Sequence, residues 1–240
     1  MGIDSAITEK VRAGVALAYL HTNVDGNANV STQYASINTY EATAYGSYVL
    51  DNITELNWQA SLGLHRNDNR RYFTGGSASG DFDTWTGQLG LGIAQAKVIN
   101  DTTVIRPSLR AEYLYARDES FSETGTAGNI FNVSGGRTNE LRLIADAKGT
   151  KELNAHTKLI GNLGVGYYLL HDSSSVSASI IGGGGTFVSS GIEPNRWFGQ
   201  AGVGFVATTE SAIEITGRYD IEWRESFDTQ MASLKVRVPF

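Results

Sequence analysis

The chain has 240 residues, a net charge of −6, 28 glycines, only 3 prolines and no cysteine. Its 19 lysines and arginines are scattered singly, which argues against nucleic-acid binding. The lack of cysteine excludes disulfide frameworks, thiolate zinc sites and cysteine nucleophiles. Since no linker-like stretch divides the chain, we expect a single domain over residues 1–240.

The mean hydropathy is −0.20, and no apolar run is long enough for a membrane-spanning helix. Membrane β-strands escape this test, because they need only about 9 to 11 residues with every second one facing lipid. Residues from Met1 onward show neither the basic head nor the apolar core of a secretion signal. We therefore expect a mature chain or a fragment.

Apolar and polar residues alternate along nearly the whole chain, whereas a helical period is almost absent. Within residues 55–65, for example, one face carries Leu56, Trp58 and Leu62, and the opposite face is polar. Such alternation indicates half-buried β-strands. Following the chain, we expect strands at residues 2–7 (the end of one), 11–22, 37–50, 55–65, 85–97, 103–117, 137–149, 153–171, 196–208, 211–224 and 230–240.

The expected connections alternate in length. Short turns fall at residues 51–54, 100–102, 150–152 and 209–210, and long polar loops at 24–36, 67–81, 118–136 and 172–195. Because successive connections of an up-and-down barrel lie at opposite ends, all the short turns share one end. Short periplasmic turns and long extracellular loops are typical of outer-membrane barrels. The pattern therefore predicts an all-β, antiparallel, up-and-down transmembrane β-barrel.

Aromatic residues are placed near the ends of the expected strands, mostly on the apolar face, as the interfacial girdles of a membrane barrel require. The core of a soluble β-sandwich would accommodate them equally well. Those near the long loops are Tyr19, Tyr40, Trp85, Tyr115, Trp197 and Trp223, and those near a short turn are Tyr48 and Trp58.

Charged residues occur inside nearly every expected strand, on the face opposite the apolar series. One Arg or Lys facing lipid near the midplane costs roughly 2 to 4 kcal/mol, and a soluble core would not absorb so many charges. A β-sandwich with a solvated outer face explains the alternation but not the pattern of connections. We therefore expect charges lining a water-filled lumen, namely Arg106, Arg110, Glu112, Glu140, Arg142, Asp146, Lys158, Arg218 and Asp220.

The last strand alternates apolar and polar residues and ends the chain on an aromatic residue. This pattern is typical of the assembly signal of outer-membrane barrels. We expect the signal to consist of Leu234, Val236, Val238 and Phe240.

Several stretches resemble the C-terminal translocator (β) domain of autotransporters, the type V secretion proteins of Gram-negative bacteria. IDSAITEK at 3–10 leads into AGVALAYLH at 13–21, which is similar to the family's early hairpin. IRPSL at 105–109 resembles its proline-containing middle strand, and FSETG at 121–125 follows. Together with the closing Phe240, the resemblance runs over residues 2–240.

The resemblance implies a 12-stranded barrel in the bacterial outer membrane, a helix that threads the pore, and an N-terminal secreted passenger. The matching sequence begins late, so we expect an N-terminally truncated barrel of 10 to 12 strands without the pore helix. The resemblance also implies that Phe240 and its apolar neighbours engage the barrel-assembly machinery. The expected partners are thus outer-membrane lipid, that machinery, and the chain's own passenger and linker helix, with the barrel itself a monomer.

Motifs for catalysis, cofactors or metals are sparse, and we expect no such site. The four histidines lack acidic or histidine neighbours at ligand spacing. Gly182 to Gly185 lacks the Lys-Ser/Thr of a phosphate-binding loop, so it is interpreted as a flexible loop tip. The function predicted is that of an outer-membrane translocator and anchor for a surface-displayed passenger, not an enzyme.

Two other functions are open alternatives. Asp81 and Asp83 resemble the paired aspartates of omptin outer-membrane proteases, although His171 and Asp172 do not form that family's Asp-x-His pair. The other alternative is a soluble β-sandwich or barrel that acts as a binding module.

Overall fold

The computed structural model describes residues 1–26, 32–126, 130–172, 175–191, 195–225 and 227–239. This part of the chain is built of strands. This described part of the chain contains no helix that is long and apolar enough to cross a membrane.

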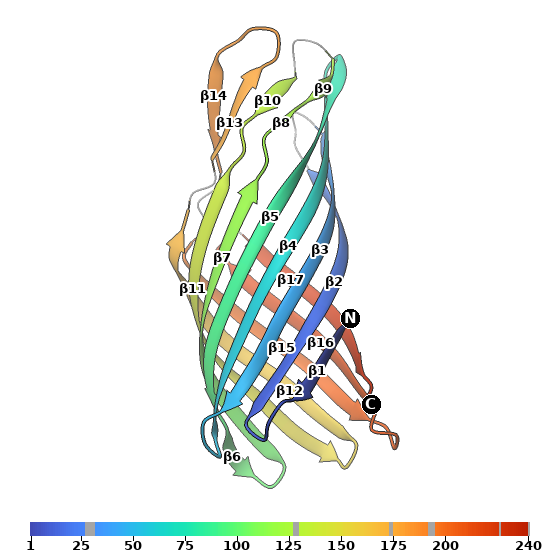
Figure 1. Cartoon of the computed structure of the whole chain (residues 1–240), viewed down its shortest axis with the longest axis vertical. Coiled ribbons are helices and arrows are strands. Elements are labelled where there is room, and N and C mark those ends of the chain that lie inside the picture. Colours follow the sequence, from blue (N-terminus) through green and yellow to red (C-terminus); the bar gives the residue numbers. More distant parts are fainter. Residues whose placement is uncertain (27–31, 127–129, 173–174, 192–194, 226, 240) are drawn as a thin grey trace.

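Most strands belong to one 13-stranded antiparallel sheet (Figure 1). Eleven follow one another across it, within the predicted range of 10 to 12, and two short ones, β6 and β9, pair beside β7 and β5. The eleven are β1 (Gly2–Ala6), β2 (Val11–Gly26), β3 (Thr32–Val49), β4 (Thr54–Phe73), β5 (Gly76–Gln95), β7 (Thr103–Asp118), β11 (Arg137–Asn154), β12 (Thr157–His171), β15 (Trp197–Thr208), β16 (Glu214–Arg224) and β17 (Phe227–Arg237); the short ones are β6 (Lys97–Asn100) and β9 (Thr124–Gly125).

The sheet curls on itself, so that β1 to β5 lie in front of β12 to β17 (Figure 1). Because side chains alternate across a strand, one series faces outward and the other faces the inside of the curl, which we call the concave face. Leu62 and Leu234 are 71% and 73% exposed on the outer face. Arg142 of β11 contacts Glu222 of β16, with β12 and β15 between them in the sheet, which places this pair on the concave face.

The expected long loop at residues 67–81 is instead the tip of a continuous hairpin. β4 and β5 have 20 residues each and stay paired up to Phe73 and Gly76, around a turn in which Gly75 has a φ of +93°. At about 3.3 Å per residue such strands span about 66 Å, well beyond a bilayer core of about 30 Å. Alternation ends near His65 because the projecting part needs no lipid-facing side, although the backbone ladder continues.

The expected turn at residues 150–152 is also wrong. β11 continues to Asn154, and Lys151 and Glu152 still pair with Leu159 and Lys158 of β12. The polar composition of this segment imitates a turn. The polar residues of this segment instead include Glu152, whose Oε1 atom forms an ion pair with Lys158 Nζ at 2.7 Å, at the short-turn end of the strands.

A second, 4-stranded sheet stands above the long-connection end of the curl (Figure 1). It consists of β8 (Phe121–Ser122), β10 (Phe131–Val133), β13 (Ser175–Ile180) and β14 (Thr186–Ser190). Two of the expected long loops therefore fold partly against each other. The glycine run at Gly182 to Gly185 forms the turn between β13 and β14, where Gly182 and Gly183 have positive φ values of 98° and 117°.

The two edges of the large sheet are β1 and β17. Each step along the eleven-strand path is antiparallel, so these two edge strands run in the same direction. Within the residues that the structure covers, they have no shared ladder. A side-chain contact nevertheless joins them, because Asp4 of β1 accepts a hydrogen bond from Arg237 of β17.

Candidate functional site

A network of charged side chains lies on the concave face, centred on Glu112 of β7. Its carboxylate accepts hydrogen bonds from Arg110 Nη1 at 3.0 Å and from Arg142 Nε at 2.7 Å. Arg142 also lies 3.7 Å from Glu222. The pairing of opposite charges lowers the cost of burying them away from bulk water. Strands β7, β11 and β16 are thereby linked across the inside of the curl.

A second polar cluster lies next to the first. Asp146 Oδ2 accepts hydrogen bonds from Asn162 Nδ2 at 3.2 Å and from Gln200 Nε2 at 3.1 Å. Arg218 donates to Asn162 Oδ1 at 2.7 Å and to Asp220 Oδ2 at 3.1 Å. A Cβ added at Gly202 would lie 2.1 Å from an oxygen of Asp220, so a larger residue there would displace the side chains of this cluster.

One oxygen of Asp146 lacks a hydrogen-bond partner among the described residues. The residue is only 9% exposed, and its Oδ1 atom makes no hydrogen bond to any part of the chain that the structure describes. The side chain borders a cavity of about 430 Å³ on the concave face, together with Arg106, Lys148 and Gln200. A buried carboxylate oxygen without a donor is costly.

A buried aromatic cluster on the concave face was not predicted. Ile144, Tyr168 and Phe198 are 6%, 5% and 3% exposed and pack together. The Arg224 guanidinium lies 4.2 Å from the centre of the Tyr168 ring. A Cβ on Gly166 would lie 2.0 Å from the Phe198 ring, so the glycine leaves the room that this ring occupies. The sequence held one signal, because adjacent Tyr167 and Tyr168 must face opposite sides of β12.

The structure brings together only some of the charges expected to line a lumen. Arg110, Glu112 and Arg142 share one network, and Arg218 pairs with Asp220 in the next cluster. Glu140 is engaged elsewhere, with Oε1 3.0 Å from His171 Nδ1. Arg106 lies opposite Lys148 in the β7–β11 ladder and is exposed.

The residues expected to form the assembly signal lie on β17 and just beyond it. Leu234, Val236 and Val238 are 73%, 57% and 55% exposed. Leu234 is opposite Gly217 and Val236 opposite Ile215 in the ladder with β16. Phe240 lies outside the described residues.

Asp81 and Asp83, which resemble the paired aspartates of omptins, both lie on β5. In the β4–β5 ladder Asp83 is opposite Arg66, and Asp81 is opposite Asp68. His171 Nδ1 lies 3.0 Å from Glu140 Oε1. In the part of the chain covered by the structure, no group of three or more metal-binding side chains is found.

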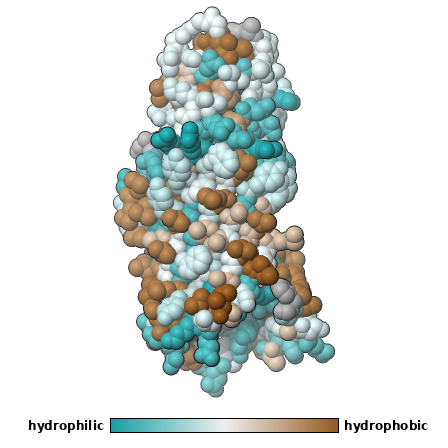
Figure 2. Space-filling view, in the orientation of Figure 1, coloured by the Kyte–Doolittle hydropathy of each residue, from teal (hydrophilic) through white to brown (hydrophobic). Residues whose placement is uncertain are grey.

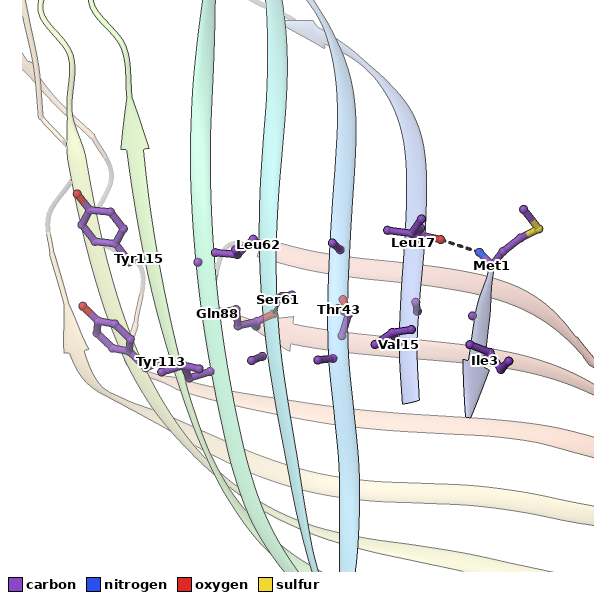
Figure 3. Close-up of a pocket in the computed structure, with 17 residues that line it drawn as sticks. Met1, Ile3, Val15, Leu17, Thr43, Ser61, Leu62, Gln88, Tyr113 and Tyr115 are labelled. Atoms are coloured by element: carbon purple, nitrogen blue, oxygen red, sulfur yellow. Dashed lines mark hydrogen bonds between the residues drawn. The ribbon is translucent and has the colours of Figure 1, made fainter. Parts of the chain in front are cut away.

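A large hollow lies on the outer face. It has a volume of about 980 Å³ and an apolar lining (Figure 3). Val15 and Leu17 stand on one side, Tyr113 and Tyr115 on the other (Figure 3). Between these two sides, several register positions carry small residues, which leave a depression in the surface. They are Ala42, Ala44, Ala60 and Gly87.

The outer face carries an apolar zone bordered by aromatic residues. Figure 2 shows hydrophobic residues concentrated over the lower half of the curl, with hydrophilic residues beneath and above them on this side. Near the long-connection end the exposed aromatics include Tyr19, Trp85 and Trp197 at 61%, 51% and 59%, and near the short turns Tyr48 and Trp58 at 43% and 40%. An apolar outer band, aromatic borders and a charged interior define an outer-membrane β-barrel.

Comparison with known proteins identifies the family. Residues 1–220 match the family described as the autotransporter beta-domain, and the chain belongs to it. The translocator domain of the autotransporter NalP from Neisseria meningitidis has the same fold, with a TM-score of 0.79 at 16% identity over 98% of this chain and 77% of that one. The beta domain of the Bordetella autotransporter BrkA superposes with a TM-score of 0.55 at 12% identity, over 96% of this chain and 91% of that one. No curated protein sequence matches significantly.

Family membership confirms the predicted function and location. The chain is an outer-membrane translocator and anchor domain of an autotransporter, which enables an N-terminal passenger to reach the bacterial surface. Its membership implies a passenger domain as partner. Translocator domains of this family are generally non-catalytic.

Proposed function

We propose that the concave face lines the conduit through which the passenger travels, and that the charged network keeps this conduit polar. The single observation that supports the proposal most is the contact of Arg142 with both Glu112 and Glu222 across the inside of the curl. Because these charges are paired, their side chains keep fixed positions on the water-exposed wall. The wall then carries both signs of charge instead of one. An extended or helical chain would then meet both donors and acceptors.

The polar cavity of about 430 Å³ on the concave face supports a contact with the transported chain or its linker helix. Arg106, Lys148 and Gln200 border this cavity together with Asp146. Polar and charged groups of a chain in the conduit would find hydrogen-bond partners there. On this proposal the domain acts by binding and guiding a chain, and not by catalysis.

Residues 1–240 form one barrel domain in this proposal, completed by one further strand. The support is topological: the edge strands β1 and β17 run in the same direction. An up-and-down barrel closes with antiparallel neighbours, so one additional strand of opposite direction fits between these edges and makes the total even. Closure would also satisfy the backbone groups of both edges, which lipid cannot do.

The outer face is proposed to contact lipid around a single barrel, which would be a monomer. The apolar face of β17, with Leu234, Val236 and Val238 exposed, supports recognition by the barrel-assembly machinery. Phe240 is proposed as the end of that signal.

Photo-crosslinking in the full-length autotransporter tests the conduit. A photoreactive phenylalanine analogue replaces Gln200, whose side chain meets Asp146 on the concave face, and in a matched control it replaces Ala201, which alternation turns outward. We expect passenger adducts from position 200 and none from position 201. Equal adducts from both positions, or none from position 200 while the passenger reaches the surface, would contradict the proposal.

A further inference from the structure

Two arginines stand directly opposite each other on the outer face. Arg117 of β7 and Arg137 of β11 are register partners, and both are exposed. Like charges in such positions repel each other and destabilise the strand pair. Among the residues that the structure describes, neither guanidinium has a hydrogen-bond or ion-pair partner. This pair of positive charges is therefore uncompensated.

The pair lies at the level of an aromatic border. Trp85 of β5 is the register partner of Arg117 on its other side and is 51% exposed. Tyr115 occupies the next outward position of β7. Trp and Tyr are enriched where the hydrocarbon of a membrane meets the headgroups. The two guanidinium groups are thus at the height of lipid headgroups, on the side of the long extracellular connections.

The apolar hollow continues directly from this pair. Arg117, Tyr115 and Tyr113 are successive outward residues of β7, and the two tyrosines form one wall of the hollow of about 980 Å³ (Figure 3). One outward step along a strand is about 6.6 Å, so Arg117 follows the Tyr115 wall of the hollow by one such step. A positive pair therefore stands at the rim of an apolar depression.

Two acidic residues lie nearby and leave the pair uncompensated. The Asp118 carboxylate accepts a hydrogen bond from Thr84 Oγ1 at 2.7 Å. Glu119 is exposed and makes no ion pair with either arginine, within the described ranges. Together with Arg117, Arg137 and nearby glycine backbone, both acids border a polar cavity of about 550 Å³.

We propose that this surface binds a phosphate-bearing lipid of the outer leaflet. Its phosphate lies between the guanidinium groups of Arg117 and Arg137, and one acyl chain fills the hollow beside Tyr113 and Tyr115. Guanidinium groups bind phosphate oxygens bidentately, and a phosphate cancels the repulsion between two opposed arginines. A free anion would use only the arginines, whereas a lipid uses the hollow as well, and this favours the lipid.

The test measures retention of bisphosphorylated lipid A by native mass spectrometry, on protein extracted from outer membranes and exchanged into neutral detergent. We expect R117Q/R137Q to weaken retention at least tenfold. The matched control, Arg66→Gln, removes an exposed arginine that is opposite Asp83 and should leave retention unchanged. Lipid A without phosphates should bind the wild-type protein weakly. Its retention should be no higher than that of bisphosphorylated lipid A on the double variant.

Two further arms separate the sources of phosphate and guard against misfolding. Millimolar inorganic phosphate should not displace the lipid, and Ala60→Phe, which fills the hollow, should weaken retention at least threefold. If the double variant fails to insert, Arg137→Gln alone provides the same comparison. Unchanged retention in the arginine variants overturns the site, and full displacement by inorganic phosphate together with no effect of Ala60→Phe shows a simple anion site instead of a lipid site.

Discussion

At the scale of single residues, the short turn between β3 and β4 depends on one carboxylate. Asp51 Oδ1 accepts hydrogen bonds from the backbone amides of Ile53 at 2.9 Å and Thr54 at 2.8 Å. These bonds, of which the one from Ile53 has the largest effect, hold the pKa of Asp51 below its ordinary value. Desolvation of the carboxylate opposes the shift. Such an aspartate turn organises the chain reversal that sets the register of the hairpin.

This lowered pKa gives a pH dependence with a defined sign. The charged form is favoured in the folded state, so its stabilisation is present above the ordinary pKa of 3.8 and is lost as the pH falls through the lower, folded value. We expect Asp51→Ala to unfold at a lower temperature than wild type at pH 7, with the difference shrinking below about pH 4. Thermal unfolding in detergent, followed by gel mobility, measures this.

The neutral variant Asp51→Asn is the control. Its amide oxygen can accept the same bonds without a charge, so its difference from wild type should be smaller than that of the alanine variant at pH 7. An alanine effect that persists unchanged at pH 3 would contradict the role given to the carboxylate.

At the scale of elements, β17 has one face for lipid and one for water. Leu234 is 73% exposed on the outer face, and Lys235 beside it is turned to the other face by strand alternation. An arginine facing lipid costs roughly 2 to 4 kcal/mol near the midplane and less toward the membrane surfaces. We expect Leu234→Arg to reduce the assembled protein several-fold, as measured by heat-modifiable mobility of outer-membrane fractions.

The neighbouring position supplies the comparison. Lys235→Gln alters the charge of the same strand on its other face and should assemble like wild type. If both variants assembled equally well, β17 would have no lipid-facing side, and its outward residues would not form an assembly signal.

At the scale of the whole molecule, the two edges of the sheet are joined by charge. Asp4 of β1 contacts Arg237 of β17, although 233 residues separate them in the chain, and it also lies 2.6 Å from Arg12 of β2. The side chain of Asp4 is 15% exposed and that of Arg237 is 41% exposed. This contact holds together two strands that share no backbone ladder.

A double-mutant cycle of Asp4→Asn and Arg237→Gln measures the contact. We expect a coupling free energy of about 1 kcal/mol in the unfolding of the detergent-solubilised protein, since the pair is partly shielded from water. The cycle of Glu152→Gln and Lys158→Gln is the reference, because those side chains are 49% and 46% exposed, and it should give about 0.3 kcal/mol. A coupling no larger than in the reference cycle would show that charge does not hold the edges together.

Much of the fold could be predicted because alternation in a strand is local. The positions of Leu56, Trp58 and Leu62 already indicate a strand with one apolar side, and the membrane restricts charges to the other. Strand ends were less accurate. Beyond the bilayer the backbone ladder of β4 and β5 continues with polar residues on both faces, and the polar end of β11 imitates a turn.

What the sequence determined by itself was the alternating face of each strand and hence the class of barrel, because a side chain's side depends only on its position along the strand. The partners of those side chains depend on tertiary structure. That Arg142 meets Glu222, that Phe198 packs on Tyr168 inside the curl, and that Arg117 opposes Arg137 follow from strand register and curvature. These bring together residues far apart in the chain, and no local pattern encodes such distances.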